Sequence, residues 1–231
     1  MVWNAVLEDI IFQALHTFKI SAHPELILPP SLAQAVSKRQ RDFLAGRYCA
    51  YQRYQALGMT WDHLPVTASG APAWPSGFCG SITHSKSLAA AVLFSCEQAK
   101  AVGIDAEHIM EEDLAQRVSS QILHPDEKHW VNTPEQLTAI FSLKESLYKA
   151  LNPLLQRFIG FEEVCVFPFS DSLLTLPEHR HRKGLRLDFE PVNALREDFP
   201  TGFTRHGYAY VLSEPMLQIF TTYRHPTHNF F

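Results

Sequence analysis

Carboxylate side chains in two separated stretches are the residues best suited to chemistry. Residues 101–107 read Ala-Val-Gly-Ile-Asp-Ala-Glu, and because side chains alternate along a strand, Asp105 and Glu107 share one face. Two carboxylates there repel each other unless a cation or a basic group lies between them. Glu145 offers a third oxygen ligand, and a hard cation such as Mg²⁺ takes a few carboxylates together with water and phosphate oxygens. The alternative is an ordinary solvated acidic face.

Glu145 lies on a predicted helix that also carries Lys149. Residues 133–136 predict its start, because Thr, Pro and Gln there form a capping box with proline at the first helical position. Asn-Pro at 152–153 predicts its end. Glu145 and Lys149 are four residues apart, so they share a face, and the alternative for them is an exposed ion pair. Opposite them lies an apolar stripe of Ile140, Leu143, Leu147, Leu151 and Leu154.

A second predicted helix, residues 31–57, is rich in basic side chains. Ser31 and Gln34 predict its start, and Gly58 predicts its end. Asp42 is its single acid, against Lys38, Arg39, Arg41, Arg47 and Arg53. A charged helical face is usually just solvated. The functional alternative is a phosphate cradle, because the arginine fork matches phosphate oxygens.

The remaining pattern predicts an α+β protein. Residues 88–107 favour an antiparallel hairpin that ends in the acidic strand. Just before it comes Ser81-Ile82-Thr83-His84, where a single histidine beside a strand is usually a structural residue. Residues 111–122 favour a helix. Further strands are predicted at 161–167, 185–189, 203–212 and 216–223, which are rich in Phe, Val, Leu, Tyr and Thr.

Composition is that of an ordinary soluble protein. The chain has 46% hydrophobic residues and a net charge of −4, so nucleic acid is not an expected partner. Its cysteines show no metal-binding spacing, which predicts reduced thiols in the cytoplasm and argues against a zinc site; they are Cys49, Cys79, Cys96 and Cys165. Residues 1–20 lack a signal-peptide pattern, and no transmembrane segment is predicted.

At four places the sequence resembles one known family. Gly103-Ile104-Asp105-Ala106-Glu107 and Phe141-Ser142-Leu143-Lys144-Glu145-Ser146-Leu147-Tyr148-Lys149 resemble the paired signature of 4′-phosphopantetheinyl transferases. The subgroup resembled is the enterobactin-synthase component D type, related to the Sfp type. Residues 41–47 and 81–84 are similar to two further segments of these enzymes, so the resemblance runs from about residue 39 to 165. Ala71 stands where the family often has a cofactor-binding lysine.

The resemblance implies a role for each matching residue. Asp105, Glu107 and Glu145 would hold Mg²⁺, although Mn²⁺ could serve. Glu145 would also act as the catalytic base, directly or through a metal-bound water, and Lys149 would steady the phosphate or protonate the leaving group. Lys144 would add positive potential. Coenzyme A would be bound by Asp105, Lys144 and Lys149 together with Arg39, Arg47, Ser81 and His84, with Arg41 as a further candidate.

The implied fold is the 4′-phosphopantetheinyl transferase fold, in which two similar α+β halves are related by pseudo-twofold symmetry. The halves would be residues 1–107 and 108–231, with coenzyme A between them and the protein a monomer. The implied reaction moves the phosphopantetheine arm of coenzyme A to a serine of an apo carrier protein and releases adenosine 3′,5′-bisphosphate. The carrier could be a peptidyl, aryl or acyl carrier protein of nonribosomal peptide, polyketide or fatty-acid synthesis, and the subgroup favours siderophore synthesis.

Two alternatives belong to other functional classes. A metal-dependent phosphohydrolase could use the same carboxylates, but it leaves Lys149 and the segment 81–84 unexplained. A non-catalytic module that binds coenzyme A or carrier protein would be favoured by loss of a metal carboxylate, and all three acids are present.

Overall fold

The computed structural model describes residues 9–67, 70–168, 185–212 and 218–227. The chain divides into two compact units. Unit 1 comprises Met1–Lys100 with Pro226–Phe231, and unit 2 comprises Ala101–His225. This division falls inside strand β4 (Ala99–His108), whereas the boundary predicted from the sequence follows Glu107, near the end of the same strand.

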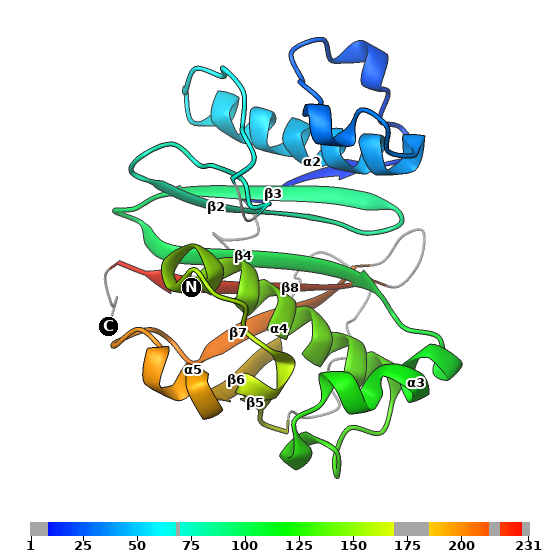
Figure 1. Cartoon of the computed structure of the whole chain (residues 1–231), viewed down its shortest axis with the longest axis vertical. Coiled ribbons are helices and arrows are strands. Elements are labelled where there is room, and N and C mark those ends of the chain that lie inside the picture. The colour runs from blue at the N-terminus through cyan, green and yellow to red at the C-terminus, as the bar shows by residue number, and fades with distance from the viewer. Residues whose placement is uncertain (1–8, 68–69, 169–184, 213–217, 228–231) are drawn as a thin grey trace. The chain divides into compact units, whose positions relative to one another are not determined.

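Unit 1 is a three-stranded antiparallel sheet with one long helix packed on it (Figure 1). The strands are β1 (Ile11–Ala14), β2 (Phe78–His84) and β3 (Leu88–Ser95), in the order β1-β3-β2. The helix is α2 (Ser37–Ala56), preceded by the short 3-10 helices η1 (Ile20–Ala22) and η2 (Pro30–Leu32). Its buried face contributes Leu44, Ala45, Cys49 and Ala50 to a core shared with Ala89 and Ala91 of β3.

The predicted start of this helix at Ser31 is wrong, because Pro30 begins a separate 3-10 turn. The α-helix begins at Ser37 after Val36, which is extended. The side-chain amide of Gln40 donates to the carbonyls of Leu32 and Ala33, which ties the turn to the first helical residues. The predicted end is confirmed within two residues, and Gly58 follows with φ of 67°.

The predicted hairpin of residues 88–107 is also wrong. Strand β3 lies between β1 and β2, so both of its edges are already paired, and β2 with β3 forms the hairpin instead. Strand β4 joins the second sheet, next to β8. A strand with two partners has no free edge left for the strand that follows it.

Unit 2 is a five-stranded sheet of order β4-β8-β7-β6-β5, with α4 packed on it (Figure 1). The other strands are β5 (Val164–Val166), β6 (Leu185–Pro191), β7 (His206–Leu212) and β8 (Gln218–Pro226), and neighbours from β5 to β8 pair antiparallel. The helices are α3 (Glu112–Ile122), α4 (Pro134–Leu155) and α5 (Asn193–Asp198), with 3-10 turns η3 (Pro125–Glu127) and η4 (Phe161–Glu163). The helix and strand predictions for 111–122 and 161–223 are therefore confirmed in outline within the described residues.

The central helix of unit 2 begins as predicted. Thr133 Oγ1 accepts a hydrogen bond from Gln136 N, and Gln136 Oε1 accepts one from Thr133 N, both at 3.3 Å. The predicted apolar stripe from Ile140 to Leu151 is buried, whereas its last member, Leu154, is 47% exposed in the final turn. The helix also passes through Pro153, which was expected to stop it, and ends at Gln156 in the left-handed conformation with φ of 52°. Proline in the last turn removes only one backbone hydrogen bond, so the turn survives it.

Each unit thus pairs a long helix with an antiparallel sheet, which confirms the predicted α+β class.

Candidate active site

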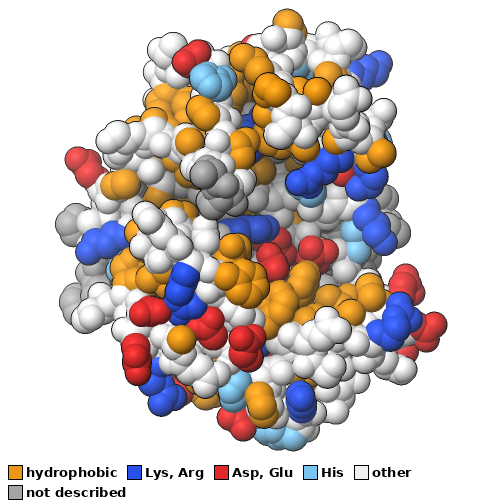
Figure 2. All heavy atoms as spheres, viewed as in Figure 1, with side chains coloured by type: hydrophobic (Ala, Val, Ile, Leu, Met, Phe, Trp, Pro, Cys, Tyr) orange, Lys and Arg blue, Asp and Glu red, His pale blue; other side chains and the backbone are white. Residues whose placement is uncertain are grey.

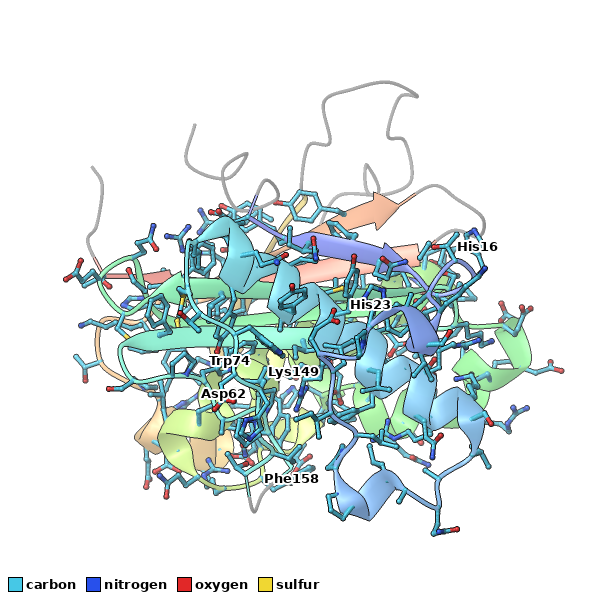
Figure 3. All side chains as sticks on the ribbon, turned by 90° about the horizontal axis from the view of Figure 1, so that it is seen from above. His16, His23, Asp62, Trp74, Lys149 and Phe158 are labelled. Carbon is cyan, nitrogen blue, oxygen red and sulfur yellow. The ribbon has the colours of Figure 1, made fainter. Side chains whose placement is uncertain are left out.

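Asp105 on β4 and Lys149 on α4 form an ion pair in unit 2. Lys149 Nζ lies 2.6 Å from Asp105 Oδ1 and 3.3 Å from the carbonyl oxygen of Ile104. The Asp105 side chain is 4% exposed, whereas that of Lys149, labelled in Figure 3, is 28% exposed. The Lys149 side chain is therefore anchored inside the protein at Nζ and is partly open to solvent.

A glycine explains how the strand and the helix come this close. A Cβ atom added to Gly103 would overlap the carbonyl oxygen of Ser146, so the backbones of β4 and α4 touch at this point. Only glycine permits that approach. Asp105 follows two residues later on the strand. On the helix, Glu145 directly precedes Ser146, and Lys149 follows it by three residues. The Gly-Ile-Asp segment and the Lys-Glu-x-x-x-Lys segment are thus one structural unit.

Glu145 is half-buried and interacts electrostatically with both members of the ion pair. Burial raises the pKa of Glu145, the ammonium of Lys149 lowers it, and the carboxylate of Asp105 raises it again, with a net upward shift. The structure therefore brings Asp105, Glu145 and Lys149 together. Glu107 lies two residues beyond Asp105 on the same strand, also half-buried.

This donor set fits a divalent magnesium-class cation. The side chains offer hard oxygen ligands and neither sulfur nor imidazole, which is the set that Mg²⁺ prefers. Burial raises the pKa of Glu145, and the nearby Asp105 carboxylate raises it further. A bound cation would relieve the repulsion between these two carboxylates.

Lys144 does not belong to this group, and its predicted contribution to cofactor binding needs correction. Its side chain is 1% exposed, and Nζ donates to Glu127 Oε2 at 2.8 Å. Nζ also donates to the carbonyl oxygens of Ile122 and Phe161, each at 3.0 Å. All three ammonium protons are used inside the protein, so this lysine is not presented to a ligand.

In unit 1, Arg47 lines a cavity of about 420 Å³. Its guanidinium carbon lies 4.4 Å from the centre of the Phe43 ring, and Nε donates to the carbonyl oxygen of Leu64 at 3.2 Å. Burial lowers the pKa of Arg47 to about 10, so it remains a cation at neutral pH. Trp61 and His63 also line the cavity. An aromatic and cationic lining of this kind suits a phosphorylated ring compound.

The other predicted cofactor ligands of unit 1 are not gathered at one point. Arg39 is exposed at the start of α2, and the guanidinium of Arg41 lies 3.2 Å from Asp42. Ser81 and His84 stand an odd number of positions apart on β2, so strand alternation sets them on opposite faces of the sheet. Thr83 shares the face of Ser81 and, like it, is buried.

Sequence reasoning missed Phe43, Trp61 and His63 as cavity residues. Trp61 and His63 belong to the aperiodic stretch 57–67, where no pattern marks a binding role, although an indole and an imidazole just before Pro65 were a usable signal. Sequence reasoning also missed the buried partner of Lys144. Glu127 accepts a hydrogen bond from His124 N at the start of η3 and another from Lys144 Nζ.

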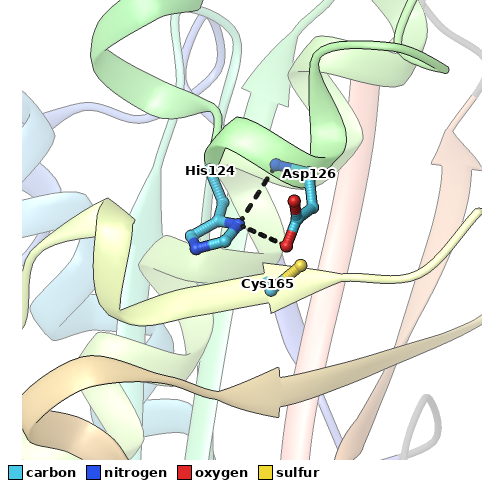
Figure 4. A group of neighbouring side chains, drawn as sticks. All are labelled: His124, Asp126 and Cys165. Carbon is cyan, nitrogen blue, oxygen red and sulfur yellow. Dashed lines mark hydrogen bonds and ion pairs between the residues drawn. The ribbon is translucent and has the colours of Figure 1, made fainter.

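His124, Asp126 and Cys165 form a cluster of possible metal-ligating side chains in unit 2, within 4.8 Å of one another (Figure 4). His124 Nδ1 accepts a hydrogen bond from Asp126 N at 3.3 Å, which caps η3. Burial and the nearby acids raise the pKa of the Cys165 thiol, so the thiolate that a metal needs is disfavoured. We therefore interpret His124 and Asp126 as the cap of η3.

Comparisons with known proteins agree with the arrangement in both units. Residues 25–94 match the family model of the 4′-phosphopantetheinyl transferase N-terminal domain, and residues 101–204 match that of the 4′-phosphopantetheinyl transferase superfamily. The chain is 32% identical to 4′-phosphopantetheinyl transferase Npt of Nocardia iowensis over 167 residues, which is 68% of this chain and 74% of the relative.

The chain belongs to the 4′-phosphopantetheinyl transferase superfamily. Two further relatives support this. The 4′-phosphopantetheinyl transferase PptT of Mycobacterium tuberculosis is 31% identical over 72% of this chain and 75% of its own length. Enterobactin synthase component D of Salmonella typhi is 35% identical over 56% of each chain.

Membership assigns the enzyme class that the resemblance implied, a transferase of phosphopantetheine to carrier proteins. The transferase is therefore preferred over the two alternatives from the sequence, a phosphohydrolase and a non-catalytic binding module. In the part of the chain that the structure describes, no helix has the length and apolar character needed to span a bilayer.

Proposed function

We propose that this transferase works with Mg²⁺ and coenzyme A and releases adenosine 3′,5′-bisphosphate. The observation that carries the proposal is the grouping of Asp105, Glu145 and Lys149, in which two carboxylates and one ammonium meet where β4 touches α4. Asp105, Glu107 and Glu145 would hold the metal. When bound, Mg²⁺ supplies positive charge that stabilises the phosphate oxygens of the transition state.

Glu145 is assigned as the base. The serine hydroxyl of the carrier gives its proton to the Glu145 carboxylate while the serine oxygen bonds to the β-phosphorus of coenzyme A. The bond from that phosphorus to the bridging oxygen breaks, and adenosine 3′,5′-bisphosphate leaves with the bond's electron pair.

Lys149 is assigned to the phosphate. It is anchored by Asp105 and the Ile104 carbonyl, yet it keeps a solvent-facing side. Its ammonium would offset the charge that develops on the leaving phosphate.

The cavity of unit 1 is proposed to hold the nucleotide end of coenzyme A. Arg47 would pair with phosphate oxygens, and Phe43 and Trp61 would contact the adenine ring. Arg39 would extend the positive charge along α2.

Carrier proteins and siderophore synthesis are the proposed partners and context, supported by the likeness to enterobactin synthase component D. On the part of unit 2 that faces the viewer in the lower half of Figure 2, acidic and basic side chains are interspersed. We propose that the protein is a monomer in the cytoplasm, which its four free cysteines fit.

The test is the intact mass of apo carrier proteins after incubation with the transferase, coenzyme A and Mg²⁺. We expect a gain of one phosphopantetheine arm, abolished by EDTA and restored by added Mg²⁺ or Mn²⁺. Transfer that is unaffected by EDTA would contradict the metal assignment. Release of phosphate without arm transfer would contradict the proposed reaction.

A further inference from the structure

Lys144 and Glu127 form an ion pair that is almost completely buried. The side chains are 1% and 0% exposed, and Nζ lies 2.8 Å from Oε2. Lysine has three ammonium donors, and here all three are used, by Glu127 and by the carbonyls of Ile122 and Phe161. We call this ion pair with its hydrogen bonds the buried clamp.

Glu127 is equally well satisfied. Its Oε1 accepts from the backbone N–H of Val166, and its Oε2 accepts from that of His124 as well as from Lys144, with the two backbone bonds at 2.7 Å. The buried clamp therefore connects α4 to four other parts of unit 2. These are the end of α3, the turn before η3, η4 and strand β5.

Stability alone is a weak reason for such an arrangement. Two charges lose their hydration on burial, and well-packed apolar side chains in their place are often as stable or more so. A lysine with three directed hydrogen bonds fixes geometry, however, because its nitrogen can occupy only one position.

The residue whose geometry this fixes is Glu145. It follows Lys144 directly, and successive helical residues differ in direction by a constant angle of about 100°. Once Lys144 is held, the direction of Glu145 is set. One residue further, the Ser146 carbonyl touches Gly103 of β4. Glu145 thus lies between two fixed points on α4.

We propose that the buried clamp is a positioning device for arm transfer, in which Lys144 and Glu127 set the rotation of α4 that directs Glu145 toward Asp105. The inference rests on the role assigned to Glu145 above. It places Lys144 outside the cofactor site: drawing its ammonium to a phosphate would leave the Glu127 carboxylate buried without its counter-charge.

The test uses a double variant, Lys144→Met with Glu127→Leu, which removes both charges and keeps the volume. The matched control is Arg157→Met with Glu163→Leu, because that ion pair, at 2.8 Å, also anchors η4 but does not adjoin Glu145. For each folded variant, kcat and KM for coenzyme A are measured in arm transfer at saturating Mg²⁺. Glu145→Gln is measured in parallel.

We expect the clamp variant to keep its cooperative melting and to lose about tenfold or more in kcat, with KM for coenzyme A within about threefold of the parent. The control should keep both constants within about threefold. A folded clamp variant with the parent kcat would overturn the inference, and so would a rise in KM alone, which would mark Lys144 as a phosphate ligand.

Should the double variant fail to fold, Glu127→Gln serves in its place. It keeps the size of the side chain and removes the charge opposite Lys144, so kcat should fall in the same direction; an unchanged kcat would overturn the inference. Glu145→Gln separates the two claims. If it is inactive while the clamp variant is normal, only the clamp is wrong, whereas an active Glu145→Gln shows that the role assigned to Glu145 is wrong.

Discussion

Oδ1 of Asp105 lies 2.6 Å from Nζ of Lys149, across the contact between β4 and α4. This ion pair joins the two sequence segments that carry the family resemblance. Lys149 lies one helical turn from Glu145. The Glu145 carboxylate therefore interacts with the positive charge of Lys149 and with the negative charge of Asp105.

Loss of the ammonium should destabilise the fold through Asp105. In Lys149→Met the buried carboxylate loses its counter-charge, and we expect the free energy of unfolding to fall by about 2–3 kcal/mol, as for a hydrogen bond to a charged group. Adding Asp105→Asn removes the unpaired charge and should recover part of the loss. Chemical denaturation of both variants measures this. A double variant less stable than Lys149→Met would contradict the pairing.

The contact at Gly103 should tolerate no side chain. In Gly103→Ala the new methyl group meets the Ser146 carbonyl, so β4 and α4 must separate. We expect a loss of stability of about 3 kcal/mol and a fall in kcat, because Asp105 moves away from Glu145. Gly46→Ala is the comparison, since its Cβ would meet only the Ile82 methyl, at 2.7 Å, and should cost less. Equal effects of the two changes on kcat would contradict this account.

Replacing Glu145 should stabilise the free protein at neutral pH. Burial and Asp105 raise its pKa above the unfolded value, so its contribution to stability is present at acidic pH and is lost as pH rises through the folded pKa. Glu145→Gln stays neutral, so without metal it should melt above the parent at pH about 7. The difference should vanish as pH falls below the unfolded value of about 4.3. A melting temperature below that of the parent at neutral pH would show that attraction by Lys149 dominates.

Arg47 should act on coenzyme A and not on the carrier protein. In Arg47→Gln the cavity of unit 1 loses its cation, and we expect KM for coenzyme A to rise about tenfold or more, as for loss of a charged hydrogen bond. KM for the carrier should stay unchanged. Arg117→Gln, on the exposed face of α3, is the control. A rise in the carrier KM instead would move Arg47 to the docking surface.

The sequence allowed much of the fold and part of the site to be predicted. Thr133 and Gln136 marked the start of α4, and alternation placed Asp105 on a strand face, because caps and periodicity are local properties. The buried partner of Lys144 was not predictable in the same way. Glu127 lies 17 positions away in a turn, and a lysine next to a leucine carries no sign of burial. The alternation of side chains along a strand would have placed Ser81 and His84 on opposite faces of β2. The resemblance to the family motif instead led to both being assigned to the same ligand.

The order of strands was harder to infer than their existence. The pattern of residues 88–107 predicted a hairpin, yet both edges of β3 are occupied by β1 and β2. Pairing between strands distant in sequence decides such cases, and no local pattern reports it.

The most direct test measures the initial rate of arm transfer against Mg²⁺ concentration for Asp105→Asn, Glu145→Gln and an exposed control, Glu112→Gln. We expect the control to follow the parent curve. Both site variants should lose about 10²-fold or more at every Mg²⁺ concentration, as for removal of a general base or a metal ligand. Parent-like rates in either site variant would contradict the assignment of Asp105 and Glu145 to the reaction.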